Sequence, residues 1–132
     1  MSARVLLVED EPDIRLIARA ALARAGFEVV TAANGVEALT LVAAECPDLI
    51  VLDWMLPELN GPDTCVRLKA NPASAHIPVV FLTGRKEDTD EARCTALGAV
   101  GYITKPFNPL RLGDQVKSLW RNAAGWSDDR KP

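Results

Sequence analysis

The amino-acid sequence predicts an α/β fold, a doubly wound sheet of five parallel strands with five helices. Short, continuous apolar runs alternate along the chain with longer segments whose apolar residues recur at helical spacing. Continuous apolar runs are typical of parallel strands, because helices cover such strands on both faces. The length of 132 residues and the 48% share of hydrophobic residues suffice for one domain with one core.

The first predicted unit is a strand over Val5–Val8 followed by a helix. The apolar run ends at the acidic residues Glu9–Glu11. Pro12 is well placed to open the helix, because proline loses no hydrogen bond at a first helical position. Gly26 is well placed to end the helix. The apolar stripe predicted for this helix consists of Ile14, Ile17, Ala18, Ala21, Leu22 and Ala25.

The same alternation continues in the middle of the chain. A second strand is predicted over residues 28–31, and a second helix over residues 35–45 ends before Pro47. The clearest strand is Leu49–Leu52, which leads directly into Asp53.

The remainder of the chain supplies three more helices and two more strands. In order, they are a short helix carrying Cys65 and Leu68, a strand over Val79–Leu82, a helix over residues 87–97, a short strand around Tyr102 and Ile103, and a last helix with Leu112, Val116 and Leu119 on one face. The helix over residues 87–97 has few apolar residues, so we expect its packing to shift easily. Residues 1–122 are expected to form the domain, and residues 123–132 a loose C-terminal tail or the start of a linker.

Composition and charge exclude several classes of function. The net charge of −3 argues against a nucleic-acid-binding surface, which usually shows a basic excess. No apolar run approaches the roughly 20 residues that a membrane span needs, and no secretory leader is recognisable. The cysteines (Cys46, Cys65 and Cys94) are far apart and odd in number, which fits neither a disulfide framework nor a zinc site. We therefore expect buried or half-buried free thiols and a cytoplasmic protein.

Reactive side chains gather where the predicted strands end. Glu9 and Asp10 follow the first strand, Asp53 follows the third, Thr83 ends the fourth and Lys105 follows the fifth. The carboxyl ends of parallel strands meet at one edge of a sheet, which is where ligands bind in doubly wound folds. Three carboxylates, a hydroxyl and an ammonium are therefore expected to converge.

This combination of side chains indicates a site for phosphoryl transfer. Clustered carboxylates repel one another unless a cation lies between them, and hard oxygen ligands suit Mg²⁺. The chemistry needs mainly positioning and neutralisation of charge. Asp53 is the candidate nucleophile, and Lys105 and Thr83 are expected to bind phosphoryl oxygens.

Four segments together resemble the receiver domain of response regulators in two-component signalling. They are Val8–Glu11, Leu52–Pro57, Phe81–Gly84 and Tyr102–Phe107, and the resemblance covers about residues 3–121. It implies a flavodoxin-like sheet with strand order 2-1-3-4-5. It also implies a signalling switch that accepts a phosphoryl group from a sensor histidine kinase or a phosphotransfer protein, and that acts on a downstream protein target or a fused output domain.

The resemblance also implies roles around the metal. Asp53 corresponds to the phosphorylated aspartate. Asp10 and Asp53 correspond to direct Mg²⁺ ligands, together with the backbone carbonyl of Met55. Glu9 corresponds to the acidic residue that usually contacts the metal through water.

Further roles concern the switch. Thr83 corresponds to the switch hydroxyl and Tyr102 to the switch aromatic, so the surface of the fourth helix, fifth strand and fifth helix is expected to change on phosphorylation. The Lys105–Pro106 bond is expected to be cis. The residues two positions beyond Asp53 and Thr83 are Met55 and Arg85, and the resemblance implies that they tune the lifetime of the acyl phosphate.

Other functions remain as alternatives. A hydrolase with an aspartyl nucleophile requires a second aspartate two residues after the first, and Met55 stands there instead. A nucleotide-binding module requires a glycine-rich loop, which does not follow Val8. A pseudo-receiver would bind proteins without phosphorylation, but the complete set of site residues argues against it. We expect no enzymatic activity beyond the chain's own phosphorylation and dephosphorylation.

Overall fold

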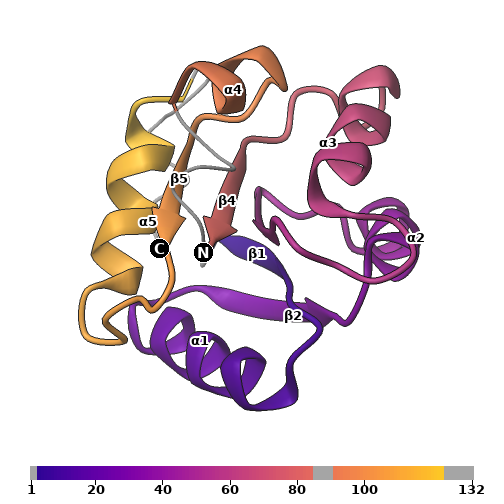
Figure 1. Cartoon of the computed structure of the whole chain (residues 1–132). Helices are drawn as coiled ribbons and strands as arrows, with labels where there is room; N and C mark the ends of the chain where they lie inside the picture. The colour runs from indigo at the N-terminus through magenta and orange to yellow at the C-terminus, as the bar shows by residue number, and fades with distance from the viewer. Residues whose placement is uncertain (1–2, 85–90, 124–132) are drawn as a thin grey trace.

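A computed structural model describes residues 3–84 and 91–123, and within them it shows one parallel sheet in the order β2-β1-β3-β4-β5 (Figure 1). The strands are β1 (Arg4–Val8), β2 (Glu28–Ala32), β3 (Leu49–Asp53), β4 (Val79–Thr83) and β5 (Gly101–Thr104). The helices are α1 (Pro12–Arg24), α2 (Gly35–Glu45), α3 (Gly61–Ala70), α4 (Glu91–Ala96) and α5 (Leu112–Arg121). The predicted fold class and strand order are confirmed.

The register of the strands brings the predicted site residues to one edge. Val8 pairs with Leu52 across β1 and β3, and Leu52 pairs with Phe81 across β3 and β4. The residues that follow Val8 therefore emerge beside Asp53. The chain leaves β1 toward β2 and then crosses back to β3, so this edge lies at the point where the strand order reverses.

Side chains of the sheet alternate between two hydrophobic clusters, one on each face. Leu52 and Phe81 point into a cluster with buried residues of α2, α3 and α4. Val51 and Leu82 point into a second cluster with buried residues of α1 and α5. Every residue of β3 and β4 is buried, as expected for central strands covered by helices on both sides.

Two side chains in the helices differ from the sequence prediction. Ile17 is 47% exposed, because α1 packs on the sheet through Ala18, Ala21 and Leu22. Trp120 was not predicted to be buried but is 1% exposed, and its ring lies 6.1 Å from that of Phe27. Trp120 therefore anchors the last turn of α5 in the second cluster, beside the partly buried Leu119.

Several sequence predictions concern properties other than the fold. Cys46, Cys65 and Cys94 are not joined in disulfide bonds, as predicted; Cys65 and Cys94 are buried as expected, but Cys46 is exposed, contrary to the expectation of buried or half-buried thiols. Helices long and apolar enough to cross a bilayer are absent from the part of the chain that the structure describes. The predicted start of the fourth helix at residue 87, Arg85 and residues 124–132 of the tail lie outside the described residues.

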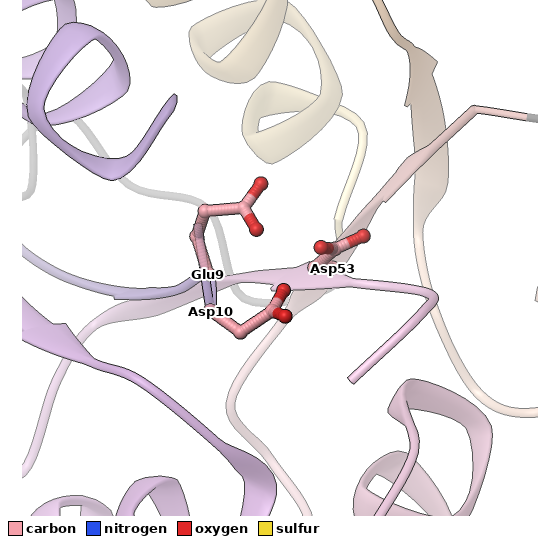
Figure 2. A group of neighbouring side chains, drawn as sticks. All are labelled: Glu9, Asp10 and Asp53. Carbon is pink, nitrogen blue, oxygen red and sulfur yellow. The ribbon is translucent and has the colours of Figure 1, made fainter. Parts of the chain in front are cut away.

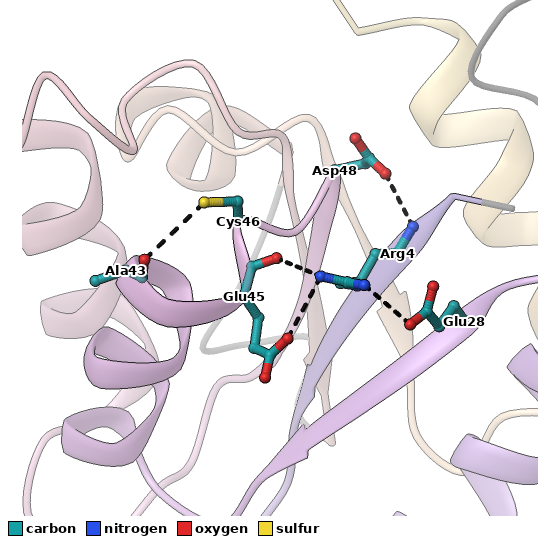
Figure 3. A network of polar contacts seen from close by, with 6 residues as sticks. All are labelled: Arg4, Glu28, Ala43, Glu45, Cys46 and Asp48. Atoms are coloured by element: carbon teal, nitrogen blue, oxygen red, sulfur yellow. Dashed lines mark hydrogen bonds and ion pairs between the residues drawn. The ribbon is translucent and has the colours of Figure 1, made fainter. Parts of the chain in front are cut away.

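Arg4 organises the opposite, amino edge of the sheet (Figure 3). Its guanidinium donates to the carbonyl of Glu45 at 2.8 Å and to a carboxylate oxygen of Glu28 at 3.0 Å. Its backbone amide donates to Asp48 at 2.9 Å. The last turn of α2 contains no basic residue, so Arg4 supplies the positive charge that favours a helix C-terminus. These contacts hold the starts of β1, β2 and β3 together.

Candidate functional site

Three carboxylates meet at the carboxyl edge of the sheet, between β1 and β3. Glu9 and Asp10 follow β1 directly, and Asp53 is the last residue of β3. Each offers one oxygen such that the three oxygens lie within 4.8 Å of one another. Figure 2 shows the three side chains directed toward a common space. The structure thus brings together the acidic residues that the sequence predicts as metal ligands.

Lys105 places its ammonium between two of these carboxylates. Its Nζ lies 2.5 Å from Oε1 of Glu9 and 2.9 Å from Oδ2 of Asp53. Glu9 is 0% exposed and Asp53 is 3% exposed. An unpaired charge at such depth would be costly, and the hydrogen-bonded ammonium offsets part of this cost.

The surroundings shift the pKa values of the charged groups. Burial raises the pKa of Glu9, and its hydrogen bond to Asp53 raises it further. Burial and the contact with Glu9 raise the pKa of Asp10. Burial alone would lower the pKa of Lys105, but its bonds to Glu9 and Asp53 raise the pKa above the ordinary value. The raised pKa means that the ammonium stays charged at neutral pH, while Glu9 and Asp10 bind protons more readily than exposed carboxyls do.

The backbone around Asp53 is held from several sides. The amide of Met55 donates to Oδ1 of Asp53 at 3.3 Å. The amide of Trp54 donates to the carbonyl of Leu82 at 2.8 Å, and the amide of Gly61 donates to the carbonyl of Trp54 at 3.0 Å. A Cβ atom at Gly61 would collide with the Asp53 carbonyl oxygen and lie 2.9 Å from Cα of Trp54. Gly61 therefore lets the following loop close over the Asp53 backbone.

The turn after β1 is fixed in a similar way. The backbone amide of Glu9 donates to the carbonyl of Ala32 at 3.0 Å, so the turn continues the pairing with β2. Arg15 of α1 donates to the carbonyl of Glu9 at 2.9 Å. The sequence alone does not indicate these roles of Arg15 and Gly61. The glycine was visible as a loop residue, but its close approach to Asp53 depends on the tertiary structure.

Thr83 and Tyr102 lie on neighbouring strands beside the carboxylates. Thr83 ends β4 and is 1% exposed, and its carbonyl accepts a hydrogen bond from the amide of Lys105 at 2.7 Å. Tyr102 on β5 is half-buried and packs against the cluster that contains Phe81. The Lys105–Pro106 peptide bond is cis, as expected. All five predicted residues of the reactive set thus lie at one edge, with Tyr102 on the adjacent strand.

The donor set fits a hard divalent cation. Within the group of Glu9, Asp10, Asp53 and Lys105, one ammonium faces three carboxylates, so negative charge remains uncompensated. Carboxylate and carbonyl oxygens are the ligands that Mg²⁺ prefers. The amide of Met55 donates to Asp53, and the ligand role of the Met55 carbonyl stays a prediction.

A family model described as the response regulator receiver domain matches residues 5–117. The chain belongs to this family. The match includes all of the carboxylates and Lys105, and it spans every strand of the sheet apart from the first residue of β1.

Curated relatives and solved structures agree with this assignment. The chain is 38% identical over 123 residues to the phosphate regulon transcriptional regulatory protein PhoB of Rhizobium meliloti, covering 93% of this chain and 54% of the relative. It is 39% identical over 123 residues to the alkaline phosphatase synthesis transcriptional regulatory protein PhoP of Bacillus subtilis, covering 93% and 50%. The chain therefore spans about half the length of the curated relatives it matches.

The fold is likewise shared with receiver structures. A putative response regulator from Chloroflexus aurantiacus superposes with a TM-score of 0.84 at 30% identity, covering 92% of this chain and 100% of that one. The chemotaxis response regulator CheY4 of Vibrio cholerae superposes with a TM-score of 0.83 at 31% identity, covering 90% and 99%.

Binding of Mg²⁺ is expected to weaken as the pH falls from about 8 to about 5. The raised pKa values of Glu9 and Asp10 mean that protons compete with the cation at pH values where exposed carboxyls remain charged. Calorimetric titration with Mg²⁺ at constant ionic strength measures the effect. Glu9→Gln removes one competing proton site and should flatten the dependence. An affinity that stays constant over this range in the unmodified chain would contradict the expectation.

Proposed function

We propose that the chain is a phosphoacceptor switch in which Asp53 accepts a phosphoryl group from a sensor histidine kinase or a phosphotransfer protein. One observation carries the proposal. Asp53 is 3% exposed, its carboxylate lies 2.9 Å from Nζ of Lys105, and it is grouped with the carboxylates of Glu9 and Asp10 within 4.8 Å. A carboxylate in this setting is positioned as a nucleophile and has both a cation site and a fixed ammonium at hand.

The transfer exchanges one bond to phosphorus for another. An oxygen of Asp53 forms a bond to phosphorus while the bond to an imidazole nitrogen of the phosphohistidine donor breaks, and that nitrogen keeps the electron pair. Asp10, Asp53 and the Met55 carbonyl would hold Mg²⁺, with Glu9 acting through water, and the bound cation would reduce repulsion between the anionic reactants. Lys105 and the Thr83 hydroxyl bind the oxygens of the transferred group.

The conformational response runs through β4 and β5. Thr83 pairs with Thr104, and Phe81 pairs with Tyr102, so the two switch residues lie on adjacent strands. Tyr102 lines a hollow of about 720 Å³ on the surface of β5 and α5, together with Gln115 of α5. Movement of the Thr83 hydroxyl toward a phosphoryl group frees space for Tyr102 to turn inward. The surface formed by α4, β5 and α5 then changes shape and is read by a downstream protein or a fused output domain.

Incubation with acetyl phosphate tests the function. The unmodified chain with Mg²⁺ should gain one phosphoryl adduct by intact-mass measurement, because acetyl phosphate supplies the group without a protein donor. Removal of Mg²⁺ should abolish the adduct. Asp53→Asn should abolish it as well, whereas Asp48→Asn at the opposite edge of the sheet should not.

The pseudo-receiver alternative makes the opposite prediction. A chain that remains unmodified by acetyl phosphate at any Mg²⁺ concentration, although it is folded, would reject the proposed phosphorylation and favour a binding domain without phosphoryl chemistry.

The protein donor is expected to dock on the exposed side of α1. Leu16 is 65% exposed and Ile17 is 47% exposed, and Arg15 one residue earlier contacts the acidic turn of the site. Apolar side chains that remain exposed beside a reactive group are suited to bury against a partner. This helix also has exposed alanines, Ala20 and Ala23, which allow another helix to approach closely.

Leu16→Ser should therefore slow phosphoryl transfer from a histidine phosphotransfer protein by about tenfold at subsaturating donor, because the variant loses one leucine contact that is buried in the complex. Its rate with acetyl phosphate should not change, because that donor needs no docking surface. Val66→Ser on α3 is the matched control, since Val66 is 52% exposed but lies on another helix. Equal rates for Leu16→Ser and Val66→Ser with the protein donor would contradict docking on α1.

A further inference from the structure

A cation–π contact joins α4 to the residue that follows the phosphoacceptor. Cζ of Arg93 lies 4.9 Å from the centroid of the Trp54 ring. Trp54 is 5% exposed, and its ring also meets Phe81 edge-on, with centroids 4.8 Å apart and planes inclined by 65°. Among cation–π pairs, arginine is the more frequent cation, and tryptophan is the aromatic ring that attracts cations best.

The Trp54 side of the contact is rigid. Hydrogen bonds hold its amide to Leu82 and its carbonyl to Gly61, and Phe81 supports its ring from β4. Trp54 is bonded directly to Asp53, so its position is fixed relative to the carboxylate site. A displacement of α4 must therefore break the contact on the Arg93 side.

Among the described residues, two hydrogen bonds hold the C-terminal end of α4. Sγ of Cys65 on α3 lies 3.3 Å from the carbonyl of Leu97, just beyond α4. The amide of Ala99 donates to the carbonyl of Cys94 at 2.9 Å, which closes the helix end. Among the described side chains of α4 (residues 92–96), Cys94 alone is buried. The contact of Arg93 with Trp54 joins α4 directly to the segment that carries Asp53.

We propose that the contact between Arg93 and Trp54 holds α4 in the conformation of the unphosphorylated chain and thereby sets the equilibrium of the switch. The inference rests on the proposed function, and it adds a regulatory contact between α4 and the segment that carries Asp53. A contact made in one conformation only must favour that conformation by its own free energy. Phosphorylation of Asp53 then weakens the contact, and loss of the contact raises the population of the conformation that accepts the phosphoryl group.

Variants at position 93 test the proposal in the full chain. Arg93→Ala removes the contact, and Arg93→Lys keeps a cation that stacks less well on the ring. Arg67→Ala is the matched control, because Arg67 is an exposed arginine on α3 outside the site. Three measurements apply: the rate of phosphorylation by subsaturating acetyl phosphate with Mg²⁺, hydrogen exchange of residues 92–97, and the NMR signal of the Trp54 indole N–H, assigned with Trp54→Phe.

The Arg93→Ala variant should be phosphorylated about two- to fivefold faster than the unmodified chain. This factor corresponds to the free energy of an exposed cation–π contact. Hydrogen exchange in α4 should accelerate by a similar factor, and Arg93→Lys should fall between the two. Phosphorylation of the unmodified chain should move the Trp54 indole signal in the same direction as Arg93→Ala does.

Other outcomes overturn the inference. If Arg93→Ala shifts the Trp54 signal but its phosphorylation rate and hydrogen exchange equal those of Arg67→Ala, the contact exists without controlling the switch. If the Arg93→Ala variant is phosphorylated more slowly than the unmodified chain, the contact favours the active conformation instead. Absence of a phosphoryl adduct on the unmodified chain is a different result, because it rejects the proposed function itself.

Discussion

Lys105 places a single ammonium between Glu9 and Asp53, two carboxylates that water hardly reaches, while Asp10 adds a third negative charge nearby. Buried charges are tolerated only when they are paired, and one ammonium cannot neutralise three carboxylates. Burial, followed by the neighbouring carboxyl groups, raises the pKa values of Glu9 and Asp10. The remaining negative charge would favour a divalent cation, so in the proposed function the electrostatic cost and the binding of the cation have the same origin.

The rest of the fold maintains this unfavourable arrangement. The parallel register aligns the ends of β1 and β3, and the turns on either side are held by Arg15 and by the close approach of Gly61. At the opposite edge, Arg4 joins the strand starts to the end of α2. The two hydrophobic clusters keep the central strands fixed on both faces. Among the described helices, α4 is the shortest, and Cys94 is the one buried residue among its described side chains, so we expect the capacity for change on the side where β5 and α5 also lie.

The sequence was sufficient to predict the strands and the acidic edge, because continuous apolar runs and the residues that end them are local features. The environments of Ile17, Trp120 and Gly61 could not be predicted from such local features. A helical stripe does not reveal how wide the contact with the sheet is, so Ile17 was wrongly placed in the core. Trp120 lies at the end of α5, where burial depends on Phe27 from another part of the chain. The contact of Arg93 with Trp54 joins residues that are distant in the sequence, and no local pattern indicates it.

Urea unfolding with and without Mg²⁺ tests most directly whether the acidic cluster is an electrostatic strain that a cation relieves. Without Mg²⁺, Asp10→Asn should be more stable than the unmodified chain at neutral pH, because the raised pKa of Asp10 means that folding disfavours its charge. Mg²⁺ should stabilise the unmodified chain and have little effect on Asp10→Asn. Asp13→Asn, an equal change of charge in the first turn of α1, should retain the full response to Mg²⁺. An unmodified chain that is more stable than Asp10→Asn and indifferent to Mg²⁺ would contradict the account.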